Sequence, residues 1–496
     1  MRVVLLQCEL EHRHQAPHLA GALFVSDLRA AGHEVRCALV HPTAIDALAE
    51  WFADPDLVLL DSIFPFALVR RVMAQTDATV VVGGHNALQH VLRGPASHAL
   101  VGAARQTLGG LVETLERRGP LESVAGLWFR RDGVVDCGPP APVPTLQSEL
   151  LPFEPDLDWE YLGPPRAPGS NLRIPSIVAE VGCVWNRSAL APGGAFADTR
   201  PRVPDVPLSS RARATFERQF LDAEGGCTFC TFRHLRIPAR APLPLLVQQA
   251  KALVERGARG LSLQSEHPLP WLADLIDALG AAGLISRLDE LHIRTIPWLL
   301  VRHEDDLRAA ASRAREHDLR LVLAQIGFEA FDERTLAVFN KGLTAEANRR
   351  AARLAADLDA ELPALRATGG HGLVPLHPWS TPEDVLTNVA ACRADAPWLL
   401  PSLSPLARIE LYNEWTPLFW KAQDEGLLRR DAASFGWTWE YADPRMGELT
   451  AAAAAIGGDA QALEAAARLV LEEPDPQARR AAYLSLRRRR GRSGAG

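Results

Sequence analysis

The sequence has no run of about 18 uninterrupted apolar residues, the length that a membrane-spanning helix needs. Its start also lacks the basic stretch and cleavage site of a signal peptide, since Met1 leads almost directly into the strand-like Val3-Val4-Leu5-Leu6. The net charge is only −7 over 496 residues, which gives the whole chain no electrostatic basis for binding nucleic acid. These absences predict a cytoplasmic protein with no membrane span and no nucleic-acid partner.

Cysteine is scarce, with seven in the chain. A reducing compartment keeps thiols free, so we expect metal binding or catalysis rather than a disulfide framework. Four of the cysteines lie in apolar runs, in a helical pattern or beside a turn, where a thiol acts as a small buried hydrophobe; they are Cys8, Cys37, Cys137 and Cys392. The other three need a different explanation.

The composition is that of a folded protein with more than one domain. Hydrophobic residues make up 47% and charged residues 23%, which are ordinary values for globular chains. A chain of 496 residues exceeds what a single core usually supports. The arginines at 487–490 and 492 predict a disordered basic tail without assigned function.

Apolar strand-like runs alternate with amphipathic helical stretches from the start of the chain, as in a parallel sheet with crossover helices. The expected strands cover residues 3–7, 34–40, 57–60, 78–82 and 98–101, and the expected helices 18–31, 44–52 and 67–74. We therefore expect an α/β, doubly wound domain over residues 1–120. Ligands of such a sheet bind beyond the carboxyl ends of the strands, where the loops carry Ser62, Gly83, Gly84 and His85.

Three further regions are expected. Residues 121–172 form a connector, with a hairpin near Asp132-Gly133 followed by a proline-rich stretch. Residues 173–405 contain repeated strand and helix units, which predict a partial or full (β/α) barrel with its site at the strand carboxyl ends. Residues 406–496 are rich in alanine and leucine and predict a helical C-terminal segment.

Cys227-Thr228-Phe229-Cys230 places two thiols within reach of one metal centre, and the preceding Gly225-Gly226 lets the backbone wrap closely around it. A single pair of this spacing also suits redox exchange, half of a zinc site or no special role. The pair therefore leaves the choice between these chemistries and an iron-sulfur cluster open.

Up to about residue 400 the order of several motifs resembles the cobalamin-dependent radical S-adenosylmethionine (SAM) family. Residues 80–87 resemble the Gly-Gly-Pro-His segment of its cobalamin domain, and residues 127–133 resemble its connecting hairpin. Leu151-Pro152-Phe153 resembles the entry to its radical domain. The most specific match is Ile326 to Leu336 followed by Asn340-Lys341-Gly342-Leu343-Thr344, which resembles the fourth barrel strand and its helix.

The resemblance implies a [4Fe-4S] cluster held by three cysteines, usually spaced CxxxCxxC. This chain has Ala223 where the first of them would stand, whereas Glu180-Val181-Gly182-Cys183 resembles the start of the motif. An insertion at about residues 188–226 reconciles the two, because ligands need to meet only in space. The implied ligands are Cys183, Cys227 and Cys230, with one iron left for SAM.

The same resemblance implies sites for two more cofactors. Those for SAM are Phe229 near the cluster or adenine, Ser265 and Glu266 near the amino end, and Glu329 near the ribose. Arg294 is expected to meet either the SAM carboxylate or a substrate anion. Those for cobalamin are Ser62, Gly83, Gly84 and His85. No histidine signature for cobalt follows the first strand, so the resemblance implies a cobalt without a protein histidine. Residues 102–105 depart from the pattern of many relatives, so the resemblance assigns no cobalamin contact there.

The function implied is methylation or rearrangement of an unactivated carbon, with a 5′-deoxyadenosyl radical removing hydrogen and cobalamin carrying a methyl group. Such an enzyme needs an electron donor and a small-molecule or peptide substrate, whose pocket Arg408, Glu410, Tyr412 and Trp415 could line. The alternative is a degenerate relative that binds a corrinoid, zinc or a partner without radical catalysis. His234 is available as a zinc ligand in that case.

Overall fold

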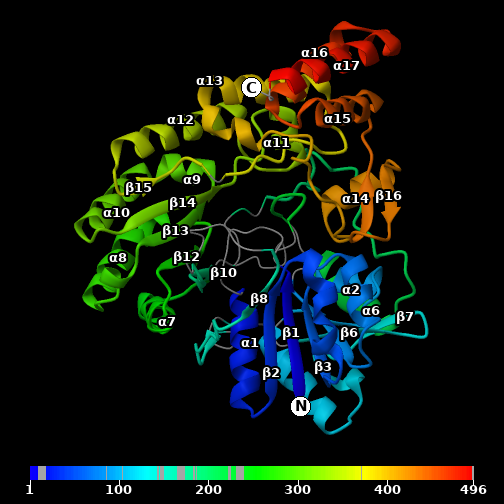
Figure 1. Ribbon diagram of the computed structural model, residues 1–496, viewed down its shortest axis with the longest axis vertical. Helices are drawn as coiled ribbons and strands as arrows, with labels where there is room; N and C mark the ends of the chain where they lie inside the picture. The colour runs from blue at the N-terminus through cyan, green and yellow to red at the C-terminus, as the bar shows by residue number, and fades with distance from the viewer. Residues whose placement is uncertain are drawn as a thin grey trace.

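The computed structural model describes residues 1–8, 18–84, 86–102, 104–141, 145, 150–164, 174–181, 185, 187–221, 225–230, 239–369 and 371–493. Figure 1 shows two α/β parts, the N-terminal one below and the second at the upper left, with the C-terminal region along the right and top. This is the mixed α/β architecture expected from the sequence. No helix in the described ranges has the length and apolar character needed to cross a membrane.

The first sheet has eight strands in the order β7-β6-β5-β4-β3-β1-β2-β8. Its parallel centre consists of β2 (Glu34–Val40), β1 (Arg2–Cys8), β3 (Leu57–Asp61), β4 (Thr79–Gly83) and β5 (His98–Leu100). Alternate residues of β1 enter two separate cores, with Val4 and Leu6 in one and Val3 and Leu5 in the other. Both faces of the sheet are therefore buried, which explains why its strands read as continuous apolar runs.

Helices cover both faces of this sheet: α1 (Leu19–Ala30), α2 (Phe66–Met73), α3 (Ala87–Leu92) and α4 (Ala104–Glu116). Pro42–Phe52 is a 3₁₀ helix where the periodicity predicted an α-helix over 44–52. Its N-terminal residues are tied to the chain before it, since the backbone N–H of Ala44 donates to the His41 carbonyl at 2.8 Å.

The connector predicted at 121–172 contributes strands to both edges of the first sheet. β6 (Leu127–Arg131) pairs antiparallel with β5, β7 (Val134–Cys137) pairs with β6, and β8 (Glu160–Leu162) pairs parallel with β2. The predicted hairpin turns at Asp132 (φ 50°) and Gly133 (φ 78°), the two positive φ angles that a tight two-residue hairpin turn requires.

The second sheet is parallel and follows chain order: β9 (Ser176–Val178), β12 (Gly260–Gln264), β13 (Glu290–Thr295), β14 (Arg320–Ile326) and β15 (Leu365–Arg366). Within the described residues it is an open sheet of five strands, so the predicted barrel stays a prediction. The strand predicted over 364–373 pairs with β14 at only two residues, because the Asp359 carboxylate takes the backbone N–H of Thr368 at 3.1 Å. A separate short ladder joins β10 (Glu180–Val181) to β11 (Ala239–Arg240).

Most helices of this second part share one large core with the sheet. They are α7 (Leu243–Glu255), α8 (Leu272–Ala281), α9 (Pro297–Arg302), α10 (Glu304–Glu316), α12 (Ala345–Glu361) and α13 (Pro382–Asp395). The short helix α11 (Glu333–Val338) lies outside this core, and its Val338 packs against a separate cluster that includes Phe339. Cys392 lies in α13 and is fully buried, and Cys8, Cys37 and Cys137 are buried in the first part, as predicted for small hydrophobes.

The predicted insertion is folded against the first sheet. α6 (Ser210–Phe216) continues into a π-helical turn, Glu217–Leu221. Just before α6, the backbone N–H of Val135 donates to the Pro207 carbonyl at 2.8 Å, which attaches the segment to β7.

The C-terminal region differs from the helical segment that was predicted. It contains α14 (Pro417–Asp424), the hairpin β16 (Leu428–Asp431) and β17 (Gly436–Trp439), and then α15 (Pro444–Ile456), α16 (Ala460–Glu472) and α17 (Pro476–Ser493). The hairpin is too short and too rich in arginine to show an apolar strand pattern. The arginine run predicted to be disordered continues α17 as far as Ser493, because Tyr483 and Leu486 pack that helix onto the main core.

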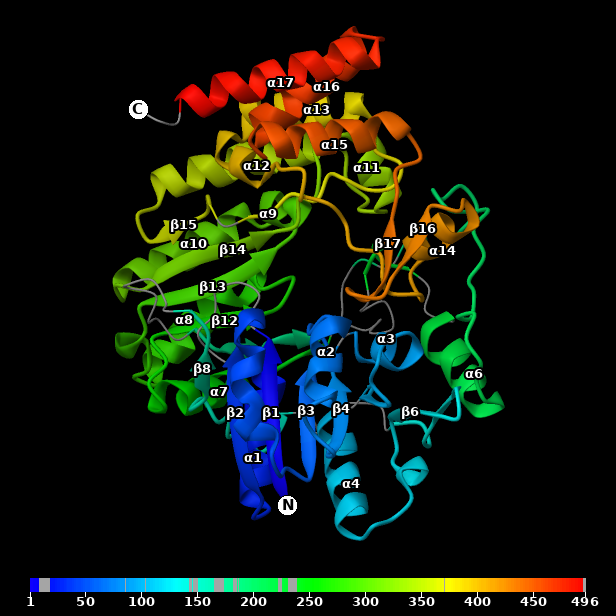
Figure 2. The ribbon, with the colours of Figure 1, turned by 45° about the vertical axis from the view of Figure 1, so that its right-hand side comes forward.

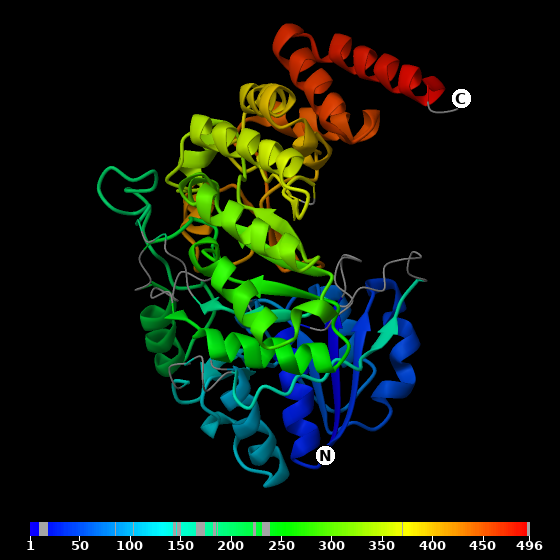
Figure 3. The ribbon, with the colours of Figure 1, turned by 90° about the vertical axis from the view of Figure 1, so that its left-hand side faces the viewer.

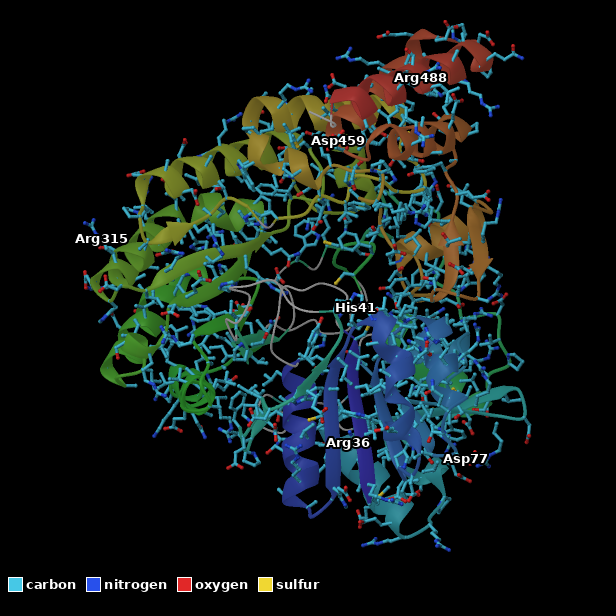
Figure 4. All side chains as sticks on the ribbon, in the orientation of Figure 1. Arg36, His41, Asp77, Arg315, Asp459 and Arg488 are labelled. Carbon is cyan, nitrogen blue, oxygen red and sulfur yellow. The ribbon has the colours of Figure 1, made fainter. Side chains whose placement is uncertain are left out.

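The carboxyl ends of the first sheet's strands point toward the rest of the molecule. In Figure 4 Asp77, which precedes β4, lies at the lower end of the sheet, and His41, which follows β2, lies at its upper end. Figure 2 shows α14 and the hairpin standing above α2 and α3. Figure 3 shows the second part above the same end of the first sheet, with α16 and α17 at the far end.

Candidate functional site

The loop that carries Cys227 and Cys230 is a tight turn. Gly225 (φ 93°) and Gly226 (φ 87°) occupy the left-handed region that a side chain disfavours. The backbone N–H of Cys230 then donates to the Cys227 carbonyl at 3.1 Å. Both cysteines are partly exposed, unlike the four buried ones. The turn therefore presents two accessible thiols from one short stretch of backbone.

The C-terminal end of α11 and the residue after it accept hydrogen bonds from this turn. Thr228 is fully buried, its backbone N–H donates to the Phe339 carbonyl at 3.1 Å, and its hydroxyl donates to the Val338 carbonyl at 2.8 Å. Phe229 packs edge-on against Phe339, with ring centroids 5.1 Å apart. Phe229 thus has a packing partner, and its expected place beside a cofactor stays a prediction.

Asn340 links this turn to the chain just beyond Cys183. Its side-chain amide donates to the Gly226 carbonyl at 2.9 Å and to the Arg187 carbonyl at 2.7 Å. The Trp185 indole N–H in turn donates to the Asn340 carbonyl at 2.6 Å. Cys183 itself, like His234 and His85, lies outside the described residues. Two segments far apart in the sequence therefore meet at one asparagine.

The backbone at Asn340 is adapted to this role. Helix α11 ends with the Lys341 N–H donating to the Leu336 carbonyl at 3.1 Å, and Asn340 adopts φ 51°, as a residue at a left-handed helix end does. Gly342 has φ 66°, and a Cβ there would lie 2.0 Å from the Trp185 ring. The Asn-Lys-Gly sequence thus fits the loop and the indole closely.

A second polar group lies at the carboxyl end of β12. The Ser265 hydroxyl donates to the Glu180 carboxylate, and the backbone N–H of His267 donates to the same carboxylate at 3.2 Å. Glu180 belongs to β10, three residues before Cys183. Ser265 is therefore connected to the segment of the first predicted ligand, and its contact with SAM stays a prediction.

Charged residues from three strand ends gather beside these groups. Burial raises the pKa of Glu266, whereas the nearby Arg294 and Lys341 act to lower it and Glu329 acts to raise it further. The Lys341 ammonium lies 3.0 Å from the Glu329 carboxylate, with side chains 8% and 17% exposed. The sequence predicted site residues at the ends of three strands: Ser265 and Glu266 after β12, Arg294 in β13 and Glu329 after β14. In the structure the charged side chains among them lie close enough to influence one another electrostatically.

The loops above the first sheet form a compact arrangement around Ser62. Ser62 is buried, and its hydroxyl accepts the backbone N–H of Asn86 at 3.1 Å. Gly84 has φ 113°, and a Cβ there would lie 2.6 Å from the Ser62 hydroxyl oxygen. A Cβ on Gly83, by contrast, would meet no atom of the described residues within 4 Å. Among the described residues, therefore, nothing covers the side-chain side of the backbone at Gly83.

The C-terminal region reaches this loop. The Asn86 amide donates to the Tyr412 hydroxyl at 3.2 Å. Burial raises the pKa of Glu410 and of Tyr412. Trp415 is buried and packs against Phe220 of the insertion, at 5.1 Å between ring centroids. Tyr412 lies beside the candidate cobalamin loop, whereas Trp415 has a packing role.

Sequence reasoning missed Asn340, Lys341 and Glu180 as site residues. All three lie inside the motifs on which the family resemblance rests. For Asn340 and Lys341 a signal was available: an asparagine, which tolerates a left-handed backbone, stands directly before a lysine and a glycine. No group of three or more histidine, cysteine or acidic side chains suited to a metal occurs within the described ranges, which leave out Cys183.

Comparison with known proteins supports the fold. The chain is similar to two structures of the radical S-adenosylmethionine methyltransferase TsrM from Kitasatospora setae. The one with tryptophan substrate and the SAM analogue aza-SAM has a TM-score of 0.52 and 17% identity, over 86% of this chain and 76% of TsrM. The one with cobalamin and a [4Fe-4S] cluster has a TM-score of 0.52 and 18% identity, over 85% and 75%. No family model and no curated protein matches.

Proposed function

We propose that this chain is a cobalamin-dependent radical SAM enzyme that methylates an unactivated carbon of a small-molecule or peptide substrate. The observation that carries the proposal is the amide of Asn340, which bonds to the carbonyls of Gly226 and Arg187 and so draws the segment after Cys183 to the loop of Cys227 and Cys230. A split motif needs such a meeting point, because its ligands come from segments separated by an insertion. The fold shared with TsrM supports the same assignment.

The groups present fit the cofactors. Two thiols on one tight turn suit a [4Fe-4S] cluster, with Cys183 as the third proposed ligand. Carboxylates and cations at the ends of β12, β13 and β14 suit the polar ends of SAM, which would be held by Ser265, Glu266, Arg294 and Glu329. When bound, these groups supply reductive cleavage of SAM, while cobalamin carries the methyl group.

The face above the first sheet suits cobalamin. Gly83, where a Cβ would meet no described atom within 4 Å, lets a flat, bulky ligand approach the backbone at a strand end. Gly84 lets that turn pack against the Ser62 hydroxyl. We propose that Ser62, Gly83, Gly84 and His85 line that site. The Tyr412 hydroxyl, which accepts from the Asn86 amide at 3.2 Å, supports a role for this region in excluding water and forming the substrate pocket, together with Arg408 and Glu410.

The assignment is tested by anaerobic reconstitution of the full chain with iron, sulfide and cobalamin, followed by SAM and a reductant. We expect iron and sulfide uptake and the release of 5′-deoxyadenosine or S-adenosylhomocysteine, identified by mass spectrometry. Zinc uptake without either product contradicts the proposal.

Asn340→Gly is expected to weaken cluster retention without preventing folding. Glycine keeps the left-handed backbone of Asn340 (φ 51°) but removes both amide bonds that join the two cysteine segments. Loss of such supporting contacts typically costs about 10-fold or more in metal affinity. The measurement is the rate of iron release to a chelator from the reconstituted protein.

The matched control is Asp318→Gly, which makes the same kind of change at an exposed turn residue with φ 55° remote from the cysteine turn. It should release iron at the rate of the unchanged chain. Equal release rates in the two variants would refute the role of Asn340.

A further inference from the structure

A lysine is buried beside the cysteine turn. The Lys341 side chain is 8% exposed, and its ammonium lies 3.0 Å from one oxygen of the Glu329 carboxylate. Buried ammonium groups are rare unless they are paired, because burial removes the hydration of the charge. The fold therefore maintains a positive charge at this point.

Hydrogen bonds join the segment that contains Lys341 to the turn that contains the two thiols. Asn340, directly before Lys341, donates its amide to the carbonyl of Gly226, directly before Cys227. On the other side of the same turn, Thr228 bonds to the carbonyls of Val338 and Phe339. Lys341 thus lies in the segment that makes these hydrogen bonds to the cysteine turn.

The charges around Lys341 are mainly negative. Burial by itself acts to lower the pKa of Lys341, but the negative charges of Glu329, Cys227 and Glu266 outweigh it and leave that pKa raised. The buried ion pair with Glu329 thus favours the charged form of Lys341. It acts as a fixed charge and not as a proton donor.

We propose that Lys341 is a positioning residue that raises the reduction potential of the cluster bound at Cys227 and Cys230, an inference that rests on the proposed function. Reduction adds one electron, taken from an external reductant, and thus one negative charge to the cluster. A fixed positive charge nearby stabilises that extra negative charge, and local charge is one of the determinants of cluster potential. Glu329 offsets part of this effect because it shares the ammonium.

The test is a redox titration of the reconstituted full chain with dithionite, without SAM, followed by electron paramagnetic resonance. At the effective dielectric of a protein, removing a unit charge within about 10 Å changes an equilibrium about tenfold. Lys341→Met should therefore lower the ratio of reduced to oxidised cluster about tenfold at a fixed potential, which for one electron is a shift of about 59 mV to more negative values. Lys341→Arg keeps the charge and should stay close to the unchanged chain.

The variant Glu329→Gln tests the same inference through a shift of the midpoint potential in the opposite direction. It removes the carboxylate that offsets the ammonium and should move the midpoint to more positive potential. A cluster-containing Lys341→Met with an unchanged midpoint, or a Glu329→Gln shift in the negative direction, overturns the inference while leaving the proposed function intact. An unchanged chain that takes up no cluster overturns both.

Discussion

Replacing Cys183 by alanine is expected to abolish assembly of the [4Fe-4S] cluster. Two thiolates from the turn at Cys227 and Cys230 cannot hold a cluster that needs three protein ligands and leaves one iron for SAM. The measurement is iron and sulfide content after anaerobic reconstitution, together with the release of 5′-deoxyadenosine. We expect the variant to have almost none of the cluster of the unchanged chain.

Cys392→Ala is the matched control for that experiment. Cys392 is fully buried in α13, and burial raises the pKa of its thiol to about 12, so it stays protonated and away from metal. The control should keep its full cluster content. A Cys183→Ala chain that holds as much iron as the control would show that the first ligand lies elsewhere and that the split motif is wrong.

Glu414→Ala is expected to lower the free energy of unfolding by about 3–5 kcal/mol, the usual cost of leaving a buried charge without its partner. The Glu414 side chain is 2% exposed and faces Arg93, which is 7% exposed. Its carboxylate accepts from Arg93 Nη2 at 2.7 Å, from the Trp437 indole at 2.8 Å and from the Gln89 amide at 3.2 Å. In the variant the Trp437 indole loses its acceptor, and among the described residues the buried Arg93 keeps only the carboxylate of Asp205, whose side chain is 60% exposed. The Gln89 amide keeps the Phe435 carbonyl at 3.3 Å.

The effect of Glu414→Ala should extend to the cobalamin face. Gln89 lies in α3 and Arg93 follows that helix, which is the first element after Gly83 and Gly84. Trp437 belongs to β17, in the hairpin above α3. We therefore expect weaker cobalamin binding together with a lower midpoint in urea. Because a chain with several parts does not unfold in one step, the comparison uses the first transition on the full chain.

Glu440→Ala is the control for this prediction. Its pair with Arg429 is exposed, at 58% and 51% of the side chains, and exposed ion pairs contribute at most about 1 kcal/mol. If Glu414→Ala destabilised the chain no more than Glu440→Ala, the buried network would not anchor the C-terminal region.

The elements with strong apolar periodicity were predictable, and those without it were not. The parallel strands at the centre of the first sheet form where the apolar runs predicted them, because both of their faces are buried. The hairpin β16–β17 escaped prediction, and the strand predicted over 364–373 is reduced to β15. Leu428–Asp431 is mostly arginine and aspartate, and Leu365–Arg366 is limited by a side-chain hydrogen bond from elsewhere in the chain.

The candidate site was also predictable only in part. The cysteine turn and the polar residues at the ends of β12, β13 and β14 could be proposed from motifs, because the carboxyl ends of parallel strands share one edge. The roles of Asn340 and Lys341 could not. Each depends on which carbonyl or carboxylate the fold places within about 3 Å of a side chain.

By itself the sequence determined the α/β character of the chain, its buried cysteines and the residue types available for a cluster, because hydrophobic periodicity and thiol chemistry are local properties. Only the tertiary structure decided that the segment after Cys183 meets the turn of Cys227, and that a buried ammonium lies beside it. The reason is that the residues between 187 and 225 separate the two segments in the chain, and their approach follows from hydrogen bonds made by a third segment, at residues 338–342.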